Sequence, residues 1–153
     1  MSEPNYAGNI IVVLANLPDF LRTPILKKRM LEFFAMAKPE QDILINNALE
    51  AGPTIPFPNF SKLFKTWLEI LTVLPEEQRT GLFSAYINEI SKNPQKLIAF
   101  NLDGILEIYL NLDEQKKEII SSSVKSIIDS FDEETKRKLL LIIPDSAQKQ
   151  LKL

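Results

Sequence analysis

The sequence predicts an all-α fold, a single domain of about eight antiparallel helices spanning residues 1–153. Apolar residues recur at helical spacing along most of the chain, and the clearest stripe runs over residues 60–74. Proline or aspartate followed by glutamate separates the stripes at near-regular intervals, and these residue types favour helix starts. No two strand-like segments are available to pair with each other, so we expect helices throughout.

The first helix is expected over residues 5–17, although the β-branched run 10–14 also suits a buried strand. A strand without a partner is unfavourable, so we predict a buried helix that ends before Pro18, because the residue before a proline leaves the helical region. The second helix is expected to begin at Thr23-Pro24, where a hydroxyl and a proline suit a helix start. The third is expected to begin at Pro39.

Residues 52–59 (Gly-Pro-Thr-Ile-Pro-Phe-Pro-Asn) are the predicted Pro-rich internal linker between two helical halves. Three prolines in eight residues stiffen the backbone, so that ordering it against a partner costs little entropy. Phe57 is expected to be either a core anchor folded back beside Trp67 or an exposed contact. The linker is therefore the candidate partner-binding site, with the residues Ile55, Phe57, Phe60, Lys62 and Trp67.

The second half of the chain repeats the same helix-start chemistry. Gly81, inside the fifth predicted helix, is expected to permit close approach of a neighbouring helix. Asn101 and Gly104 predict a kink or break in the sixth. The starts of the fifth to eighth helices, and of a short last turn, are predicted at Pro75, Asn93-Pro94, Asp113, Asp132 and Pro144.

A boundary phrase recurs along the chain: residues 74–83 match residues 131–140 position by position, and residues 112–117 form a third copy. Such phrases anchor at positions 17, 37, 56, 74, 93, 112 and 131, which predicts helical hairpins of about 38 residues. Single copies of the phrase resemble helix boundaries in the repeats of the magnesium-transporter cytosolic N-domain and of the flagellar rotor switch protein. The shared residues are mostly leucine and glutamate, so no functional residue carries over. An irregular bundle and a short α-helical-repeat superhelix both fit this spacing.

The chain contains no cysteine and no histidine. Disulfides, thiolate nucleophiles, Ser-His-Asp catalysis and histidine-ligated zinc are therefore excluded. The acid pairs Glu76/Glu77 and Glu133/Glu134 are explained by the helix dipole, because they fall in first turns. We expect no enzyme activity, no cofactor and no metal.

The formal charge of −2 gives no electrostatic footprint for nucleic acid, so we expect no nucleic-acid partner. The N-terminus carries an acid and no base, unlike a signal peptide, and no apolar run approaches the length of a membrane span. We therefore expect a cytoplasmic chain without a membrane span.

These features predict a non-catalytic helical protein–protein interaction module, a scaffold or adaptor. The alternative is a regulatory domain that binds an apolar small ligand or lipid in a cavity between helices, lined by Phe33, Phe34, Phe64, Trp67 and Phe83. A homodimer through residues 9–17 is also expected, because the end helices of an open array expose apolar flanks.

Overall fold

The computed structural model describes residues 6–151 and 153, and this part of the chain contains ten α-helices, one short 3-10 helix and no strand. The all-α prediction is confirmed. The helices number ten because the sixth predicted helix is broken in two and the last turn is a helix of its own. They are α1 (Tyr6–Ala15), α2 (Asp19–Phe33), α3 (Lys38–Ala51), η1 (Gly52–Thr54), α4 (Phe57–Val73), α5 (Glu76–Lys92), α6 (Gln95–Ile98), α7 (Leu102–Leu110), α8 (Glu114–Asp129), α9 (Glu133–Ile142) and α10 (Asp145–Leu151).

The helix starts recur with a period of 19 residues. Seven successive N-caps keep this spacing, and we call the stretch from one N-cap to the next a segment. With α1 as the first segment, the sixth contains both α6 and α7, because its helix is interrupted. Asp113 and Asp132 cap as predicted, each side chain accepting a hydrogen bond from the backbone N–H three residues on. The seven N-caps are Pro18, Ala37, Pro56, Pro75, Pro94, Asp113 and Asp132.

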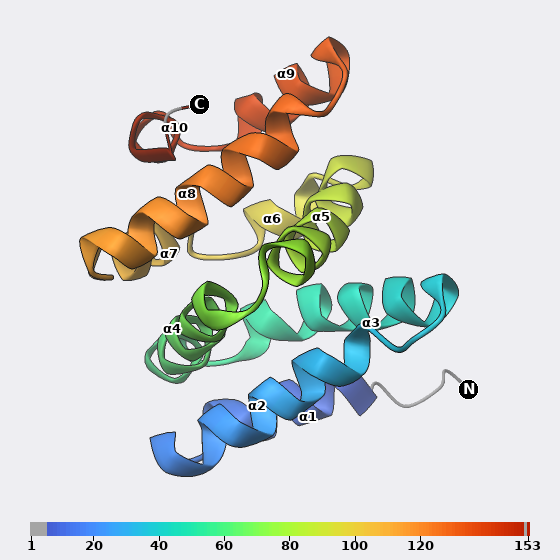
Figure 1. Ribbon diagram of the computed structural model, residues 1–153, viewed down its shortest axis with the longest axis vertical. Coiled ribbons are helices and arrows are strands. Elements are labelled where there is room, and N and C mark those ends of the chain that lie inside the picture. The colour runs from blue at the N-terminus through green and yellow to red at the C-terminus, as the bar shows by residue number, and fades with distance from the viewer. Residues whose placement is uncertain (1–5, 152) are drawn as a thin grey trace.

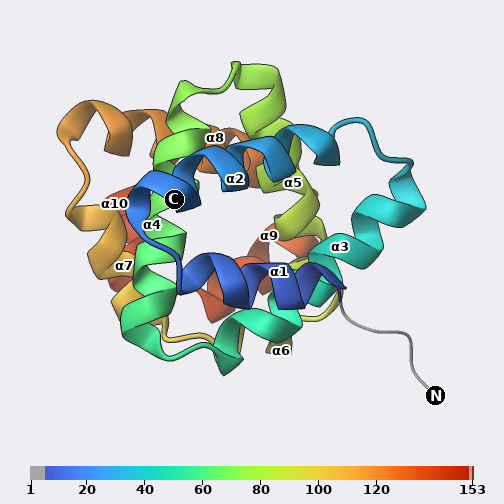
Figure 2. The same cartoon turned by 90° about the horizontal axis from the view of Figure 1, so that it is seen from below.

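Most segments stack in a regular order, in which a segment packs on the next but one. Helix α1 packs against α3, α2 against α4, α3 against α5, α4 against α7, and α5 against α8. Figure 1 shows the resulting array, which rises from α1 and α2 at one end to α9 and α10 at the other. Figure 2, viewed along the array, shows the helices arranged around a central region. These contacts join the helices in one all-α bundle.

Side chains near the helix starts donate hydrogen bonds to carbonyl groups at the ends of the preceding helices. A helix leaves its last four carbonyl groups without intrahelical donors. At four boundaries the residue four positions after the N-cap donates a side-chain hydrogen bond to one of these carbonyl groups. The acceptor lies eight residues before the donor in the sequence, and we call the donor the boundary donor. The boundary donors are Arg22 to Leu14, Gln41 to Phe33, Arg79 to Leu71 and Gln148 to Leu140, at 3.0, 2.9, 3.4 and 2.7 Å.

The apolar core is continuous along the array, and Leu14, Ile45 and Leu71 are its largest fully buried side chains. These three residues come from α1, α3 and α4, so the core joins elements that are distant in sequence. No buried side-chain nitrogen or oxygen atom in the described chain lacks a hydrogen-bond partner. The core is thus apolar with its polar groups satisfied, which is the condition for a stable interior.

Three local predictions differ from the structure. Helix α2 begins at Asp19, with Pro18 as its N-cap and Pro24 inside it, and not at Thr23-Pro24. Residues 52–59, predicted as a Pro-rich linker, are mostly helical, because η1 and the first turn of α4 occupy all but two of them. A Cβ on Gly81 would meet nothing within 4 Å, so this glycine does not permit a close helix approach.

Candidate ligand-binding cavity

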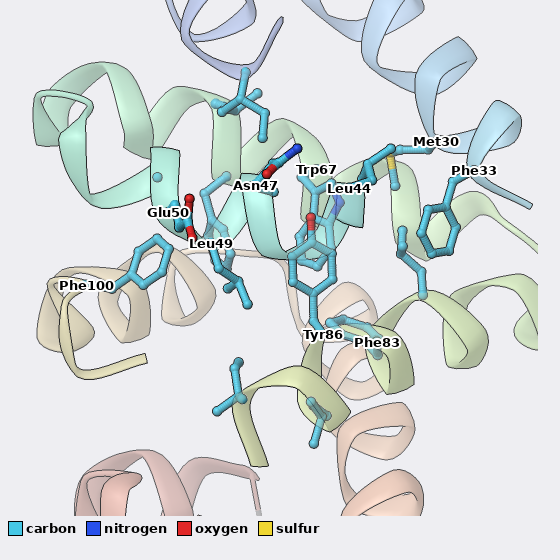
Figure 3. Close-up of a pocket in the computed structure, with 18 of the residues that line it drawn as sticks. Met30, Phe33, Leu44, Asn47, Leu49, Glu50, Trp67, Phe83, Tyr86 and Phe100 are labelled. Atoms are coloured by element: carbon cyan, nitrogen blue, oxygen red, sulfur yellow. The ribbon is translucent and has the colours of Figure 1, made fainter. Parts of the chain in front are cut away.

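A cavity of about 1020 Å³ lies at the centre of the array (Figure 3). Its wall takes side chains from every helix from α1 to α9, and nearly all of them are apolar. Among those labelled in Figure 3 are Met30 and Phe33 from α2, Leu44 from α3 and Phe83 from α5. The stacking of segments on their next-but-one neighbours brings these residues together, since they lie far apart in the sequence.

Helix α4 carries a ladder of aromatic rings, and three of them, Phe60, Phe64 and Trp67, line one side of the cavity. Phe57, Phe60, Phe64 and Trp67 are spaced three or four residues apart, so they share one face of the helix. Successive ring centroids lie 6.1, 5.6 and 5.7 Å apart. Phe100, which follows α6, packs on Phe60 at 5.5 Å. Each ring of the ladder thus packs against its neighbours at the separations that aromatic pairs favour.

Trp67, the last ring of the ladder along the chain, packs against two aromatic rings of α5. The ring of Trp67 lies edge to face with Phe83 at 5.6 Å and with Tyr86 at 5.4 Å. Protein surrounds Tyr86, and this burial raises the pKa of its hydroxyl to about 12. The side chain is nevertheless only half-buried by surface area, because part of it faces the cavity. Tyr86 therefore presents a protonated hydroxyl to the cavity at neutral pH.

The charged residues of the lining give the cavity an acidic balance. Arg29 is the one cation in the lining, and it pairs with Glu32 at 3.2 Å. Glu40 and Glu50 also belong to the lining, and both are exposed. The acids and Arg29 thus lie where water reaches them, while the interior of the cavity is apolar.

The structure separates the predicted partner-binding residues. Ile55 and Phe60 are buried, with 6% and 8% of their surface exposed, and Lys62 points to solvent. Phe57 is a half-buried anchor, but its ring packs on Gly104 and Phe60 and not beside Trp67. Trp67 lies in the cavity wall. These residues do not form one exposed surface.

The alternative prediction of an inter-helix cavity named five aromatic residues. Four of them, Phe33, Phe64, Trp67 and Phe83, line the cavity, whereas Phe34 packs edge to face on Phe33 from outside the lining. Tyr86 was missed, although it follows Phe83 by three residues and so shares its helix face. The wall from α3, which includes Leu44, gave no sequence signal beyond an ordinary apolar stripe.

Within residues 6–151 and 153, no group of three or more carboxylates is placed to hold a metal ion. None of the described helices is long and apolar enough to cross a membrane. Comparison of the chain with protein-family models, with curated proteins and with solved structures finds no match. The geometry of the cavity is therefore the basis for a functional proposal.

Proposed function

We propose that this chain is a non-catalytic helical domain that binds a small apolar ligand, of lipid-like chemistry, in its central cavity. The observation that carries the proposal is the cavity itself, about 1020 Å³ with an almost wholly apolar wall. Ligand pockets typically measure roughly 300–1,000 Å³ and are lined by apolar and aromatic side chains with a few polar groups. The cavity has that size and composition.

The energetics of an apolar cavity support a bound guest. The cavity is not sealed, because its lining includes the exposed residues Ile43, Glu40 and Glu50, so water can enter it. Water fills apolar space poorly, because the walls offer few hydrogen-bonding partners. An apolar molecule that displaces such water gains the hydrophobic free energy of both surfaces.

Binding of the neutral dye Nile red tests this proposal, with Leu44→Phe as the blocking variant. Leu44 is half-buried on the cavity wall, so the larger ring can extend into the cavity. We expect the wild type to bind the dye, and Leu44→Phe to weaken binding about tenfold, a loss of about 1.4 kcal/mol. The measurement is a fluorescence titration, with native mass spectrometry of the purified protein to detect a co-purified ligand.

The matched control is Val73→Phe. Val73 is the last residue of α4, is 69% exposed and lies outside the cavity lining, so the added ring should leave dye binding unchanged. A wild type that fails to bind Nile red, or equal binding by wild type and a folded Leu44→Phe variant, would refute the proposal.

A second candidate function is protein interaction through one end of the array, with a second copy of the chain as the partner. Exposed apolar side chains gather on α1 and α2, two helices in contact at that end (Figure 1). Val13 is 58% exposed and Phe20 is 75% exposed. Large exposed apolar patches are typical of interaction sites. We call it the end surface: Val12, Val13, Phe20, Leu21 and Ile25.

If this chain forms a homodimer through the end surface, charged substitutions there should lower its mass in solution from dimer to monomer. We expect wild type to dimerise at high concentration, and the double variant Val13→Glu/Phe20→Glu to be monomeric, because two charges cannot be desolvated in a self-complementary contact. Light scattering on a size-exclusion column measures this. Leu141→Glu is the control, since Leu141 is 80% exposed on α9 at the other end. A monomeric wild type at every concentration would remove this candidate.

A further inference from the structure

This inference rests on the proposed function and names the chemistry of the ligand. We propose that the cavity binds an uncharged, mainly apolar molecule that carries a hydrogen-bond acceptor, such as an ester or ketone carbonyl. The acceptor takes hydrogen bonds from the indole N–H of Trp67 and the hydroxyl of Tyr86.

Neither donor is used within the part of the chain that the structure describes. Among the described residues, neither the Trp67 indole nitrogen nor the Tyr86 hydroxyl has a hydrogen-bond partner. Neither residue is exposed, and both belong to the cavity lining. Both polar atoms keep accessible surface, since no buried polar side-chain atom of the described chain is unpaired. Polar groups of tryptophan and tyrosine usually find a partner when the rings are buried, so the partner here is to be sought in the cavity.

The two donors serve one part of the cavity. The rings are in edge-to-face contact, with centroids 5.4 Å apart and an interplanar angle of 77°. In Figure 3 the Tyr86 hydroxyl is directed toward the Trp67 indole, beneath Leu44 and Asn47 of α3. The phenol keeps its proton at neutral pH because burial raises its pKa to about 12. A ligand oxygen at this place therefore meets two donors, whereas the rest of the cavity wall is apolar. This difference fixes the orientation of the ligand.

The charges around the cavity favour an uncharged acceptor over a carboxylate. The lining holds one cation, Arg29, which is already paired with Glu32. Glu40 and Glu50 would repel an anionic ligand. A carboxylate next to Trp67 and Tyr86 would lose its hydration without gaining a counter-ion, which is costly. A carbonyl loses much less on desolvation and is satisfied by the two donors.

The chain carries its own reporter for the test. Trp67 is the only tryptophan in the sequence, so a change in tryptophan fluorescence on titration reports on the cavity wall directly. The probes are methyl decanoate, which has an uncharged acceptor, undecane, which has none, and decanoate, which is charged. The variant is Tyr86→Phe, which removes the hydroxyl and keeps both the ring and the reporter.

Tyr109→Phe is the matched control. Tyr109 lies outside the cavity lining, and its hydroxyl donates to the Lys117 carbonyl at 3.2 Å. Tyr109→Phe should therefore lower the midpoint of thermal unfolding and leave probe binding unchanged. Tyr86→Phe should show the opposite pattern, with an unfolding midpoint at or above that of wild type, because its hydroxyl has no partner to lose.

The expected result is a selective loss of affinity. Tyr86→Phe should weaken methyl decanoate about 2- to 10-fold, the range for one hydrogen bond, and leave undecane unchanged. Decanoate should bind wild type more weakly than its methyl ester does. Equal affinity of Tyr86→Phe and wild type for methyl decanoate, or tighter binding of decanoate, would overturn the inference and leave apolar binding standing. Failure of all three probes to bind wild type would overturn the proposed function and this inference together.

Discussion

Replacing Arg22 with methionine is expected to lower the free energy of unfolding by about 3 kcal/mol. Arg22 is a boundary donor with only 2% of its surface exposed. Its Nε donates to the Leu14 carbonyl at 3.0 Å, and its terminal nitrogens donate to the Leu17 carbonyl and the Asp19 carboxylate. Methionine replaces the aliphatic stem of arginine but has no guanidinium group, so the Leu14 and Leu17 carbonyls lose this donor. Urea denaturation followed by circular dichroism at a helical wavelength measures the loss.

Arg29→Met in the same helix is the control for this prediction. Arg29 is exposed, and its ion pair with Glu32 is a surface pair with both side chains about half in water. Such pairs contribute roughly 0–1 kcal/mol, so the unfolding free energy should change little. If Arg22→Met proved as stable as Arg29→Met, the boundary hydrogen bonds would be incidental to stability.

The substitution of alanine for glycine is expected to have opposite effects at two helical positions. At Gly104 in α7, an added Cβ would lie 2.3 Å from the Phe57 ring and 2.8 Å from the Asn101 amide. Both neighbours must move, and Asn101 is the N-cap that accepts a hydrogen bond from the Gly104 N–H. Overpacking and a damaged cap outweigh the better helix propensity of alanine, for a net loss of about 2 kcal/mol.

At Gly81 in α5 the same substitution should stabilise the protein by about 1 kcal/mol. The position is exposed and an added Cβ would meet nothing, so only the helix propensity changes. Chemical denaturation of both variants beside wild type tests the pair. A stabilised Gly104→Ala variant would show that the contact between Phe57 and α7 yields without cost.

Helix boundaries were predictable because their chemistry is local. Proline fits the start of a helix, and aspartate accepts from the N–H groups of the first turn, wherever the helix packs. Positions such as Asp113 and Asp132 were therefore located from the sequence to the residue. The same chemistry misled at residues 52–59, because Pro56 and Pro58 stand at the N-cap and first turn of α4, where a missing N–H costs nothing.

The cavity was only partly predictable, since its wall depends on which segments stack. The aromatic ladder of α4 follows from its spacing, and four of the five aromatic residues expected in a cavity lie there. The contacts of α3 with α1 and α5, which complete the wall, are not local in sequence. The boundary donors had a signal that was overlooked: Leu17-Pro18 and Leu74-Pro75 are each followed four residues after the proline by an arginine, Arg22 and Arg79.

The stacking of segments on their next-but-one neighbours restricts how such a chain can change length. Inserting a single 19-residue segment would move every later segment by one place in the stacking order, so that each would meet a neighbour other than its present one. Inserting two segments would restore every later contact, and each new boundary could carry its own donor within eight residues of its acceptor. A family built on this plan should therefore vary in steps of two segments, about 38 residues, the distance from Pro18 to Pro56.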